Sequence, residues 1–570
     1  MKKLIAFLFL MLVLSVSGWA ATYSANGAGA LGNSSTIGTV GFEDYPSLFL
    51  AAADYNSIPG GMAGNYTFFI NTSLTEPANL GFGAPTNQYT LTFKPSQSVT
   101  PTVTFTATFD NAGPSGGWII GTPNLAISDD TKLMPNVIID GSNTVGGTTR
   151  DLTLTCANNF SRDLTVPGDA GGFPVLIKFH GLCDFAVVKN TNIIMSLTDP
   201  LYVQARSYYA LTFTSRRNAV TLTNDVPDNW TVMNCSIQSV GSRQQHGIGA
   251  SNSGTITAGV AQTGVLISHN EIIGQTRGIL LNQNADFILE NNMLGCQQND
   301  PLGGLVSTGF VHSSSNGATP WTSIIRNNIF NNNFTAANVA GGGLAGMQLS
   351  GAPAAANTQY QVYNNMICNY NFAVGVPTDL VYQGITSSSS QSHMLIYHNS
   401  IDMPEKSNVT GASTWGRVSA ISSTSVNAIH DWDAQDNVIR FLQPGAFNAV
   451  YVSLGAGPTP CNYNDVWNNA LTNIGRLSPG GVGTTYANWP AWQLAGYDLL
   501  GVQFDPTVPS APGAGVWVSP IDLHFTTDPG PMYNGFLLGL VGTDIDGEGR
   551  LRPVMGCDEV PTPINDWMIY

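Results

Sequence analysis

The sequence predicts an all-β protein whose chain winds as a right-handed parallel β-helix, and three observations lead to this prediction. A short pattern of alternating apolar residues around an Asn recurs through the middle of the chain. Its copies lie between 22 and 38 residues apart, and such variable spacing suits coils that carry loops of different lengths. Hydrophobic residues make up 43% of the chain and charged residues only 10%, which favours a packed β-rich core over disorder or helices.

Each copy of the pattern reads as a strand, a bend marked by Asn, and a second strand. VMNCSI ends at Ile237 and ISHNEI ends at Ile272, and both alternate with period 2, as half-buried strands do. Asn tolerates left-handed backbone angles in a bend, and identical side chains stacked one coil apart can form a hydrogen-bonded ladder. We therefore expect the marker Asn residues on successive coils, most of them in one row at about 4.8 Å per coil: Asn234, Asn270, Asn292, Asn328, Asn365, Asn399, Asn437 and Asn464.

The apolar residues that follow these Asn should point inward and stack, because one coil cannot bury its apolar side chains alone. A β-propeller is the main alternative, but its blades hold four strands in about 40–45 residues, and the shortest repeat here is too short for that. The expected core positions are Ile237, Ile272, Leu294, Ile367, Ile401 and Ile439.

The chain divides into four parts by composition. Residues 1–20 are typical of a secretory signal peptide, with Lys2 and Lys3 before a short apolar run and small residues before the expected cut. Residues 21–130 lack the Asn unit and are expected to cap the β-helix, which occupies residues 131–470. Residues 471–570 are rich in Pro and Trp and should lie along the β-helix or cap its end.

Charge and cysteine content narrow the function classes. The net charge of −16 gives no electrostatic footprint for nucleic acid, although a local basic groove remains possible. The seven Cys include no metal-type spacing, so we expect most of them to be buried thiols. No apolar run after the signal peptide is long enough to span a membrane, so the mature chain is expected to be secreted or held at the cell surface.

Three stretches resemble secreted bacterial β-helix proteins of the pectate-lyase-like superfamily, a group that often carries type IX secretion sorting domains. They are DYPSLFLAAADYNSIPGGMAGNYTFFI from Asp44, VIIDGSNTVGGTTRDLTL from Val137, and the tail, which ends in DIDGEGRLRPVMGCDE at Glu559. The resemblance implies the architecture, with a small-residue helix followed by a strand after Asp44 and an opening coil at Val137. It implies no particular activity, and no sorting domain of the usual size is expected after Glu559.

The sequence contains candidate residues for two kinds of carbohydrate chemistry. A glycosidase needs paired carboxylates, and Asn224, Asp225 and Asp228 lie upstream of QHGIG around His246, with Arg277 31 residues further on. This stretch reads as loop, so we expect His246 to be a polar loop residue, the two Asp to be turn formers, and no hydrolase site. A lyase needs a Lys or Arg base with acidic residues or calcium beside it. Candidate bases and neighbours without a clear acidic pattern are Lys178, His180, Arg206, Arg216 and Arg217.

Two further features were weighed. The segment from Asp544 to Glu548 departs from an EF-hand loop because its Gly comes too early, so a turn with an internal Asp–Arg pair is expected there, and calcium is possible but unsupported by a motif. Five Trp residues either stack on sugar rings or cover the apolar flank of the β-helix, and the second interpretation is favoured: Trp415, Trp432, Trp467, Trp489 and Trp492.

Two functions therefore stay open. The favoured hypothesis is an extracellular or cell-surface protein that binds a polysaccharide or a matrix partner without catalysis. The alternative is a polysaccharide lyase or glycoside hydrolase that acts in a groove of the β-helix. No catalytic residue, cofactor or metal ligand is assigned, and an open groove where three or more ionisable side chains converge would favour the enzyme.

Overall fold

The structure is a computed structural model of the whole chain. It describes residues 33–38, 44–58, 60–77, 80–83, 86–106, 116–121, 134–156, 175–197, 208–214, 216–217, 224–241, 245–251, 262–282, 284, 286–296, 306–313, 321–333, 343–350, 359–371, 381–387, 393–405, 418–423, 432–445, 447–455, 460–468, 473–478, 482–512, 514–530, 533, 535–536, 538, 541–548, 550 and 554–558. The expected signal peptide lies outside these residues. Neither helix within the described ranges has the length and apolar character needed to cross a membrane.

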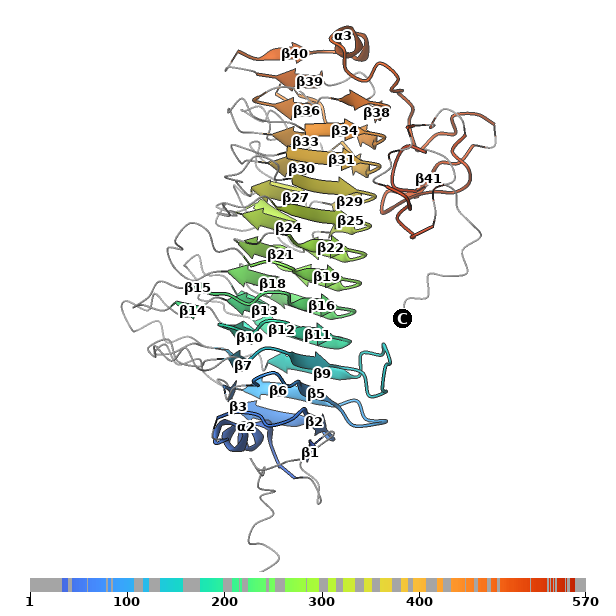
Figure 1. The fold of residues 1–570 in the computed structure, drawn as a ribbon. Helices are drawn as coiled ribbons and strands as arrows, with labels where there is room; N and C mark the ends of the chain where they lie inside the picture. The colour runs from blue at the N-terminus through green and yellow to red at the C-terminus, as the bar shows by residue number, and fades with distance from the viewer. Residues whose placement is uncertain are drawn as a thin grey trace, which may run out of the picture.

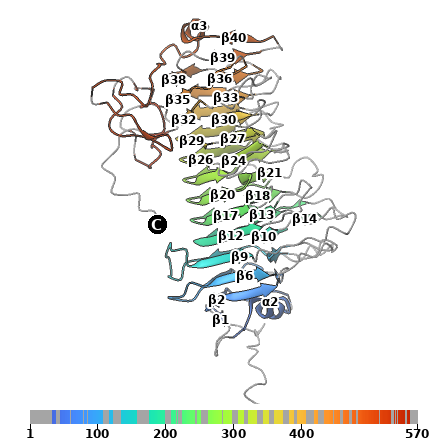
Figure 2. The ribbon, with the colours of Figure 1, turned by 180° about the vertical axis from the view of Figure 1, so that it is seen from behind.

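The chain is a right-handed parallel β-helix, so the predicted fold is confirmed. Strands from three parallel sheets alternate along the sequence, and each coil contributes one strand to each sheet in turn, giving the tall column of Figures 1 and 2. We name the sheets A, B and C in the order in which the chain enters them.

Sheet A has 13 strands: β1(Asn33–Ile37), β2(Tyr66–Ile70), β5(Leu91–Pro95), β8(Val137–Asp140), β11(Val187–Lys189), β16(Thr231–Met233), β19(Leu266–Ser268), β22(Ile288–Glu290), β25(Thr322–Arg326), β28(Gln359–Tyr363), β31(His393–Tyr397), β34(Trp432–Gln435) and β37(Cys461–Asn462). Sheet B has 12: β3(Leu74–Pro77), β6(Thr102–Thr106), β9(Leu152–Cys156), β12(Thr191–Leu197), β17(Ser236–Gly241), β20(Glu271–Gly274), β23(Met293–Cys296), β26(Ile329–Asn333), β29(Met366–Asn371), β32(Ser400–Met403), β35(Val438–Phe441) and β38(Asp465–Trp467).

Sheet C also has 13 strands, of which the last is antiparallel to its neighbour: β4(Leu80–Phe82), β7(Trp118–Gly121), β10(Val175–His180), β13(Tyr208–Thr214), β18(Gln245–Ser251), β21(Arg277–Asn282), β24(Val306–Ser313), β27(Gly343–Ser350), β30(Tyr382–Ser387), β33(Val418–Ser423), β36(Ala449–Ser453), β39(Asn473–Leu477) and β40(Thr484–Tyr486). Two small antiparallel pairs lie outside the column: β14(Arg216–Arg217) with β15(Asn224–Asp225), and β41(Trp517–Ser519) with β42(Asp522–Phe525).

The bend between sheets A and B holds the predicted Asn ladder. From Asn270 to Asn464, the side-chain Nδ2 of each Asn donates to Oδ1 of the Asn on the next coil, at 2.9–3.0 Å. Each Oδ1 also accepts the backbone N–H of the preceding Asn, so the ladder satisfies polar groups that the bend would otherwise bury unpaired. Asp498 ends the row, because its Oδ1 accepts from Asn464 Nδ2 at 2.7 Å.

The prediction was wrong at the first marker residue. Asn234 lies one position before the row, in the left-handed conformation (φ 51°), and its Nδ2 donates to Asn190. Cys235 takes the ladder position, and its backbone N–H donates to Asn270 Oδ1 at 2.8 Å. In every later unit too, the residue before the ladder Asn has positive φ: His269, Asn291, Asn327, Asn364, His398, Asp436 and Tyr463. We call these residues, together with Asn234, the bend column.

The interior is one continuous apolar core. All six residues predicted to face inward are fully buried, which confirms that part of the repeat. All seven Cys are buried thiols, as expected. Trp432 also lies inside this core, so its side chain is part of the packing.

The two ends of the column are closed differently. At the N-terminal end, strands β1 to β7 already belong to the three sheets, and helix α2(Leu48–Asn56) packs beneath the first coils (Figure 1). The carboxylate of Glu76 accepts the N–H groups of Leu48 and Phe49 at the start of this helix, at 2.7 and 3.1 Å. At the other end, helix α3(Trp489–Leu494) places Trp492 over the last coil, where its ring stacks on Tyr451 with centroids 5.5 Å apart.

Residues 501–558, which we call the tail, form a second small core on the side of the column. Figures 1 and 2 both show the tail beside the upper half of the β-helix. Trp517, Leu523, Phe525 and Tyr533 pack there with residues of sheet B such as Met366. The tail therefore lies along the β-helix, whereas the residues just before it close the end.

Candidate ligand-binding site

The outer face of sheet C brings together several of the residues considered in the sequence. In strands β10, β13 and β21, residues such as Leu211 belong to the main core. The regular alternation of a strand is interrupted here, because Tyr209, two positions before Leu211, belongs to a separate cluster. The outward side chains include their own small apolar cluster of Val175, Tyr209, Leu280 and Val311, which is separate from the main core.

Tyr209, His246 and Arg277 occupy the same register position on three consecutive strands. The rings of Tyr209 and His246 lie 4.9 Å apart at an angle of 38°. The Tyr209 ring covers Gly249, where an added Cβ would lie 2.3 Å from the ring, so only glycine fits beneath it. This close approach explains one of the glycines in the QHGIG segment.

His246 is fully buried, and neither ring nitrogen has a hydrogen-bond partner among the described residues. Burial lowers its pKa well below the usual value, and the positive charge of Arg277 lowers it further. The imidazole is therefore neutral at physiological pH and keeps one nitrogen that can accept and one that can donate a hydrogen bond.

Lys178 adds a second cation to this face. It pairs in register with Thr212 on β13 and is half-buried, as is Arg277. Burial lowers the pKa of Lys178 to about 8, so its ammonium group is mostly charged at neutral pH. The outward positions of the eight described strands from β10 to β33 include no Asp or Glu, so the local charge there is positive although the whole chain is acidic.

The structure corrects the prediction that His246 lies in a loop. Its segment forms strand β18, and its glycines serve packing. Asp228 does act as a turn former: it precedes β16 and accepts the N–H of Thr263 at 2.6 Å, on the sheet A side of the column. Asp225 lies in β15, and its side chain is outside the described part of the chain. The absence of a hydrolase site at these residues stays a prediction.

The other lyase candidates are not gathered around Lys178. His180 lies at the end of β10 and is almost fully buried. Arg216 and Arg217 form β14, but only their backbone is described, and Arg206 lies outside the described residues. Sequence reasoning missed Tyr209, and it considered Lys178 and Arg277 for different chemistries. His246 and Arg277 are 31 residues apart in the sequence, which is the length of one coil. This spacing is the sequence feature that places the two residues side by side on neighbouring strands.

The DIDGEGR segment forms the expected turn. Asp544 Oδ1 accepts the N–H groups of Asp546 and Glu548, at 3.1 and 2.9 Å. The guanidinium of Arg550 donates to backbone carbonyls, including those of Thr543 and Val554, and an Asp–Arg pair inside the turn stays a prediction. Where the chain is described, no group of three or more His, Cys, Asp or Glu side chains has a metal-binding arrangement.

Three of the five Trp residues named in the sequence are packed inside the protein. Trp432, Trp489 and Trp492 are buried, so a sugar-stacking role for these three is excluded. Trp467 ends strand β38 and is half-buried, and Trp415 lies outside the described residues.

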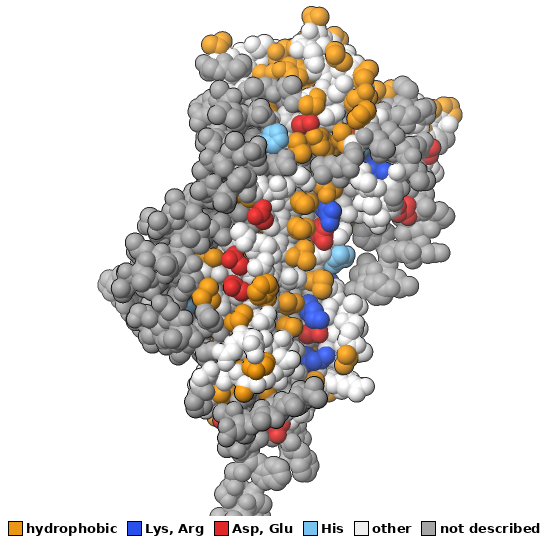
Figure 3. Space-filling view, viewed as in Figure 1, with side chains coloured by type: hydrophobic (Ala, Val, Ile, Leu, Met, Phe, Trp, Pro, Cys, Tyr) orange, Lys and Arg blue, Asp and Glu red, His pale blue; other side chains and the backbone are white. Residues whose placement is uncertain are grey.

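A Ser–His–Glu group on sheet A is a second place with chemical potential. Ser268 Oγ lies 2.6 Å from His269 Nδ1 and 3.4 Å from Glu290 Oε1. A catalytic triad needs the acid on the other nitrogen of the imidazole, whereas here both groups contact the serine. Arg326 neutralises Glu290 through a 2.6 Å contact, and Ser268 is buried, so this arrangement does not form a nucleophile site. Figure 3 shows the side of the molecule seen in Figure 1, where charged side chains lie beside a vertical stripe of hydrophobic side chains.

Comparisons with known proteins bear on the fold alone. No family model and no curated protein matches the chain. Among solved structures, a Dettilon tailspike protein matches at TM-score 0.37 and 12% identity, over 75% of this chain and 66% of the tailspike, so the chain spans just under two thirds of that protein. The Streptococcus pneumoniae surface adhesin PfbA matches at TM-score 0.37 and 12% identity, over 81% of this chain and 98% of the adhesin.

A third similar structure is a galactohydrolase whose described substrate is a sulfated galactose polymer; it matches at TM-score 0.31 and 8% identity, over 77% of this chain and 94% of that chain. All three matches have TM-scores below 0.5 and identities of 12% or less, so they carry no function to this chain.

Proposed function

We propose that this protein is an extracellular β-helix that binds acidic carbohydrate on the outer face of sheet C, without a catalytic step. One observation carries the proposal: Lys178 on β10 and Arg277 on β21 present half-buried cations on one face, and the two strands between them, β13 and β18, carry Tyr209 and His246. Ammonium and guanidinium groups recognise carboxylate or sulfate. The Tyr209 ring is buried, so its part in the site is to support the face between the two cations by packing on Gly249.

The mode of binding follows from the chemistry of each group. Arg277 is suited to two parallel hydrogen bonds to one acidic group, whereas Lys178 acts as a point charge. His246 is neutral and fully buried, so it adds no charge between the two cations. The general acidity of the chain repels acidic polymers elsewhere, so binding would be confined to this face and would weaken with salt.

One observation favours a second candidate, a polysaccharide lyase. A pKa of about 8 brings Lys178 close to the value that a general base needs near neutral pH. The described part of this face offers no acidic group to hold calcium, and for this reason we rank binding first.

The test is a screen of the secreted protein against arrayed glycans that are neutral, uronate-containing or sulfated, with parallel detection of unsaturated uronate products. We expect retention of acidic glycans that falls with salt, and no product. A Lys178→Gln/Arg277→Gln double variant should lose at least tenfold in affinity, since each charged hydrogen bond contributes about 1.5–3 kcal/mol. The matched control is Arg476→Gln, on β39 of the same sheet. Unchanged binding by the double variant would reject the site, and unsaturated product would favour the lyase.

A further inference from the structure

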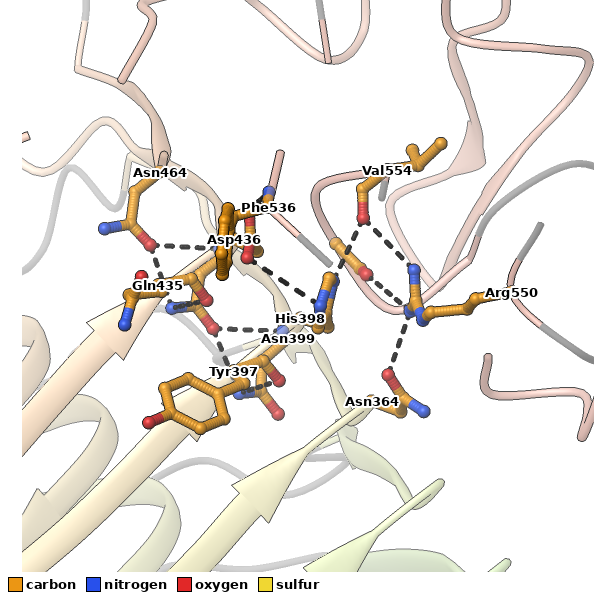
Figure 4. Close-up of polar contacts among 12 residues, drawn as sticks. Asn364, Tyr397, His398, Asn399, Gln435, Asp436, Asn464, Phe536, Arg550 and Val554 are labelled. Atoms are coloured by element: carbon orange, nitrogen blue, oxygen red, sulfur yellow. Dashed lines mark hydrogen bonds and ion pairs between the residues drawn. The ribbon is translucent and has the colours of Figure 1, made fainter. Parts of the chain in front are cut away.

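Beside its packing on sheet B, the tail is attached to the β-helix through the bend column. Asn364 Nδ2 donates to the carbonyl of Thr543, and its Oδ1 accepts from Arg550 at 2.9 Å. Further along the column, the Tyr463 ring stacks on Phe536, with centroids 5.7 Å apart. Between these two contacts lie His398 and Asp436, on consecutive coils and both fully buried (Figure 4).

His398 and Asp436 face each other through atoms that have no hydrogen bond within the described structure. His398 Nδ1 lies 3.0 Å from the carbonyl oxygen of Val554 in the tail. A carbonyl only accepts, so Nδ1 carries a proton, and Nε2 points toward Asp436 Oδ2 at 3.8 Å. Both Nε2 and Oδ2 are buried, so without a proton between them two acceptors would face each other out of contact with water.

Asp436 is also the residue that holds the tail most directly. Its Oδ1 accepts the N–H of Phe536 at 2.7 Å, and its backbone carbonyl accepts the N–H of Gly556 at 2.7 Å. A Cβ on Gly535 would lie 1.8 Å from Oδ1, so the tail backbone packs against this carboxyl group. A change in the protonation state of Asp436 therefore changes its contacts with the tail.

The charges around this pair are few. Arg550 approaches from the tail and is bound to backbone carbonyls and Asn364. Asp433, on β34, is bound to the hydroxyl of Tyr397 at 2.6 Å. Burial raises the pKa of Asp436 to about 8, while the hydrogen bond from Phe536 and the charge of Arg550 lower it and Asp433 raises it. Burial, and then Arg550, lowers the pKa of His398 well below its usual value.

We propose that one buried proton between His398 Nε2 and Asp436 Oδ2 stabilises the docking of the tail on the bend column, and that this attachment loosens as the medium becomes alkaline. This goes beyond carbohydrate binding, because it concerns a different face of the column. The proton stays on the pair while the tail is docked, and it passes to solvent when the tail leaves and both side chains become hydrated.

The pH window follows from proton counting. In water, Asp and His titrate near about 3.9 and 6.5, so the undocked pair holds one proton between these values and none above about 6.5. The docked pair holds one proton up to about 8. The pKa of the pair is raised in the docked state, so the pair contributes docking stability that is lost as the pH rises from about 6.5 through about 8. Docking should be nearly independent of pH around pH 5, then weaken by up to about tenfold per pH unit, approaching roughly thirtyfold in all by about pH 9.

The test measures hydrogen exchange of the intact protein at several pH values, with each rate divided by the intrinsic exchange rate. Protection of the tail amides at Phe536 and Gly556 should fall roughly eightfold between about pH 6.5 and 8, and roughly thirtyfold in all by about pH 9. Protection of the ladder amide at Asn399, inside the column, should stay constant over this window. Asp436→Asn places an oxygen on the Phe536 N–H and a fixed N–H on His398 Nε2, so it should keep the tail docked without pH dependence.

Asp433→Asn is the matched control, because it changes a neighbouring carboxylate that does not contact the tail; it should keep the slope of the native protein. Tail protection that does not change with pH in the native protein would overturn the proposal. An Asp436→Asn variant with the native slope would also overturn it, since the titrating group would then lie elsewhere.

Discussion

Replacing Asn399 by Asp changes only which atoms can donate, yet the ladder predicts that it will be severely destabilising. Asn399 Nδ2 donates to Asn437 Oδ1 at 3.0 Å and to the carbonyls of Val362 and Tyr397 at 2.9 and 3.0 Å. A carboxylate would turn an acceptor toward these three oxygens in a fully buried position. Losing the donors costs about 3 kcal/mol, and a buried carboxyl group that repels its neighbours adds about 2 kcal/mol.

Chemical denaturation measures this prediction. Asn399→Ala should lose about 3 kcal/mol of unfolding free energy and Asn399→Asp about 5 kcal/mol at pH 7. Burial should raise the pKa of the new carboxyl group above its unfolded value of about 3.9, so its penalty should shrink toward about pH 4 and grow as the pH rises. Asn473→Ala is the control, because that side chain makes one long 3.4 Å hydrogen bond on β39. Equal stability of the Asp and Ala variants would refute the donor argument.

Three further predictions concern the core and the ends. Ile367→Asp should unfold the middle of the column, because it buries an unpaired charge; a native melting temperature would place Ile367 outside the core. Asp498→Asn should cost about 2 kcal/mol in thermal melts, since its amide must face donors such as Trp492 Nε1, now 2.9 Å from Oδ2. Glu76→Gln should cost about 1–2 kcal/mol, because it removes the charge at the start of α2; an unchanged melting temperature would mean that water replaces the cap.

The repeat could be predicted from the sequence because each coil repeats the same local pattern. The sequence also contained the information needed to avoid the error at Asn234. In the later units the inward apolar residue comes two positions after the ladder Asn, as Ile272 follows Asn270, whereas Ile237 comes three positions after Asn234. Aligning the units on the apolar residue would have placed Cys235 in the row.

The candidate site was only partly predictable. His246 and Arg277 were both noticed, but Gly residues around His246 suggested a loop, whereas Gly249 is needed because the Tyr209 ring lies on it. Tyr209 and Gly249 lie on different coils, so no pattern within a short stretch of sequence could predict their contact. The attachment of the tail was equally hidden, since Arg550 and Asn364 are 186 residues apart.

The most direct test of the proposed function is a crystal structure of the protein with a bound oligosaccharide of uronate units. We predict that the ligand lies along the outer face of sheet C across β10 to β21, with acidic groups at Lys178 and Arg277. A ligand bound on sheet A, sheet B or the tail, with this face empty at a concentration that saturates binding in solution, would contradict the account.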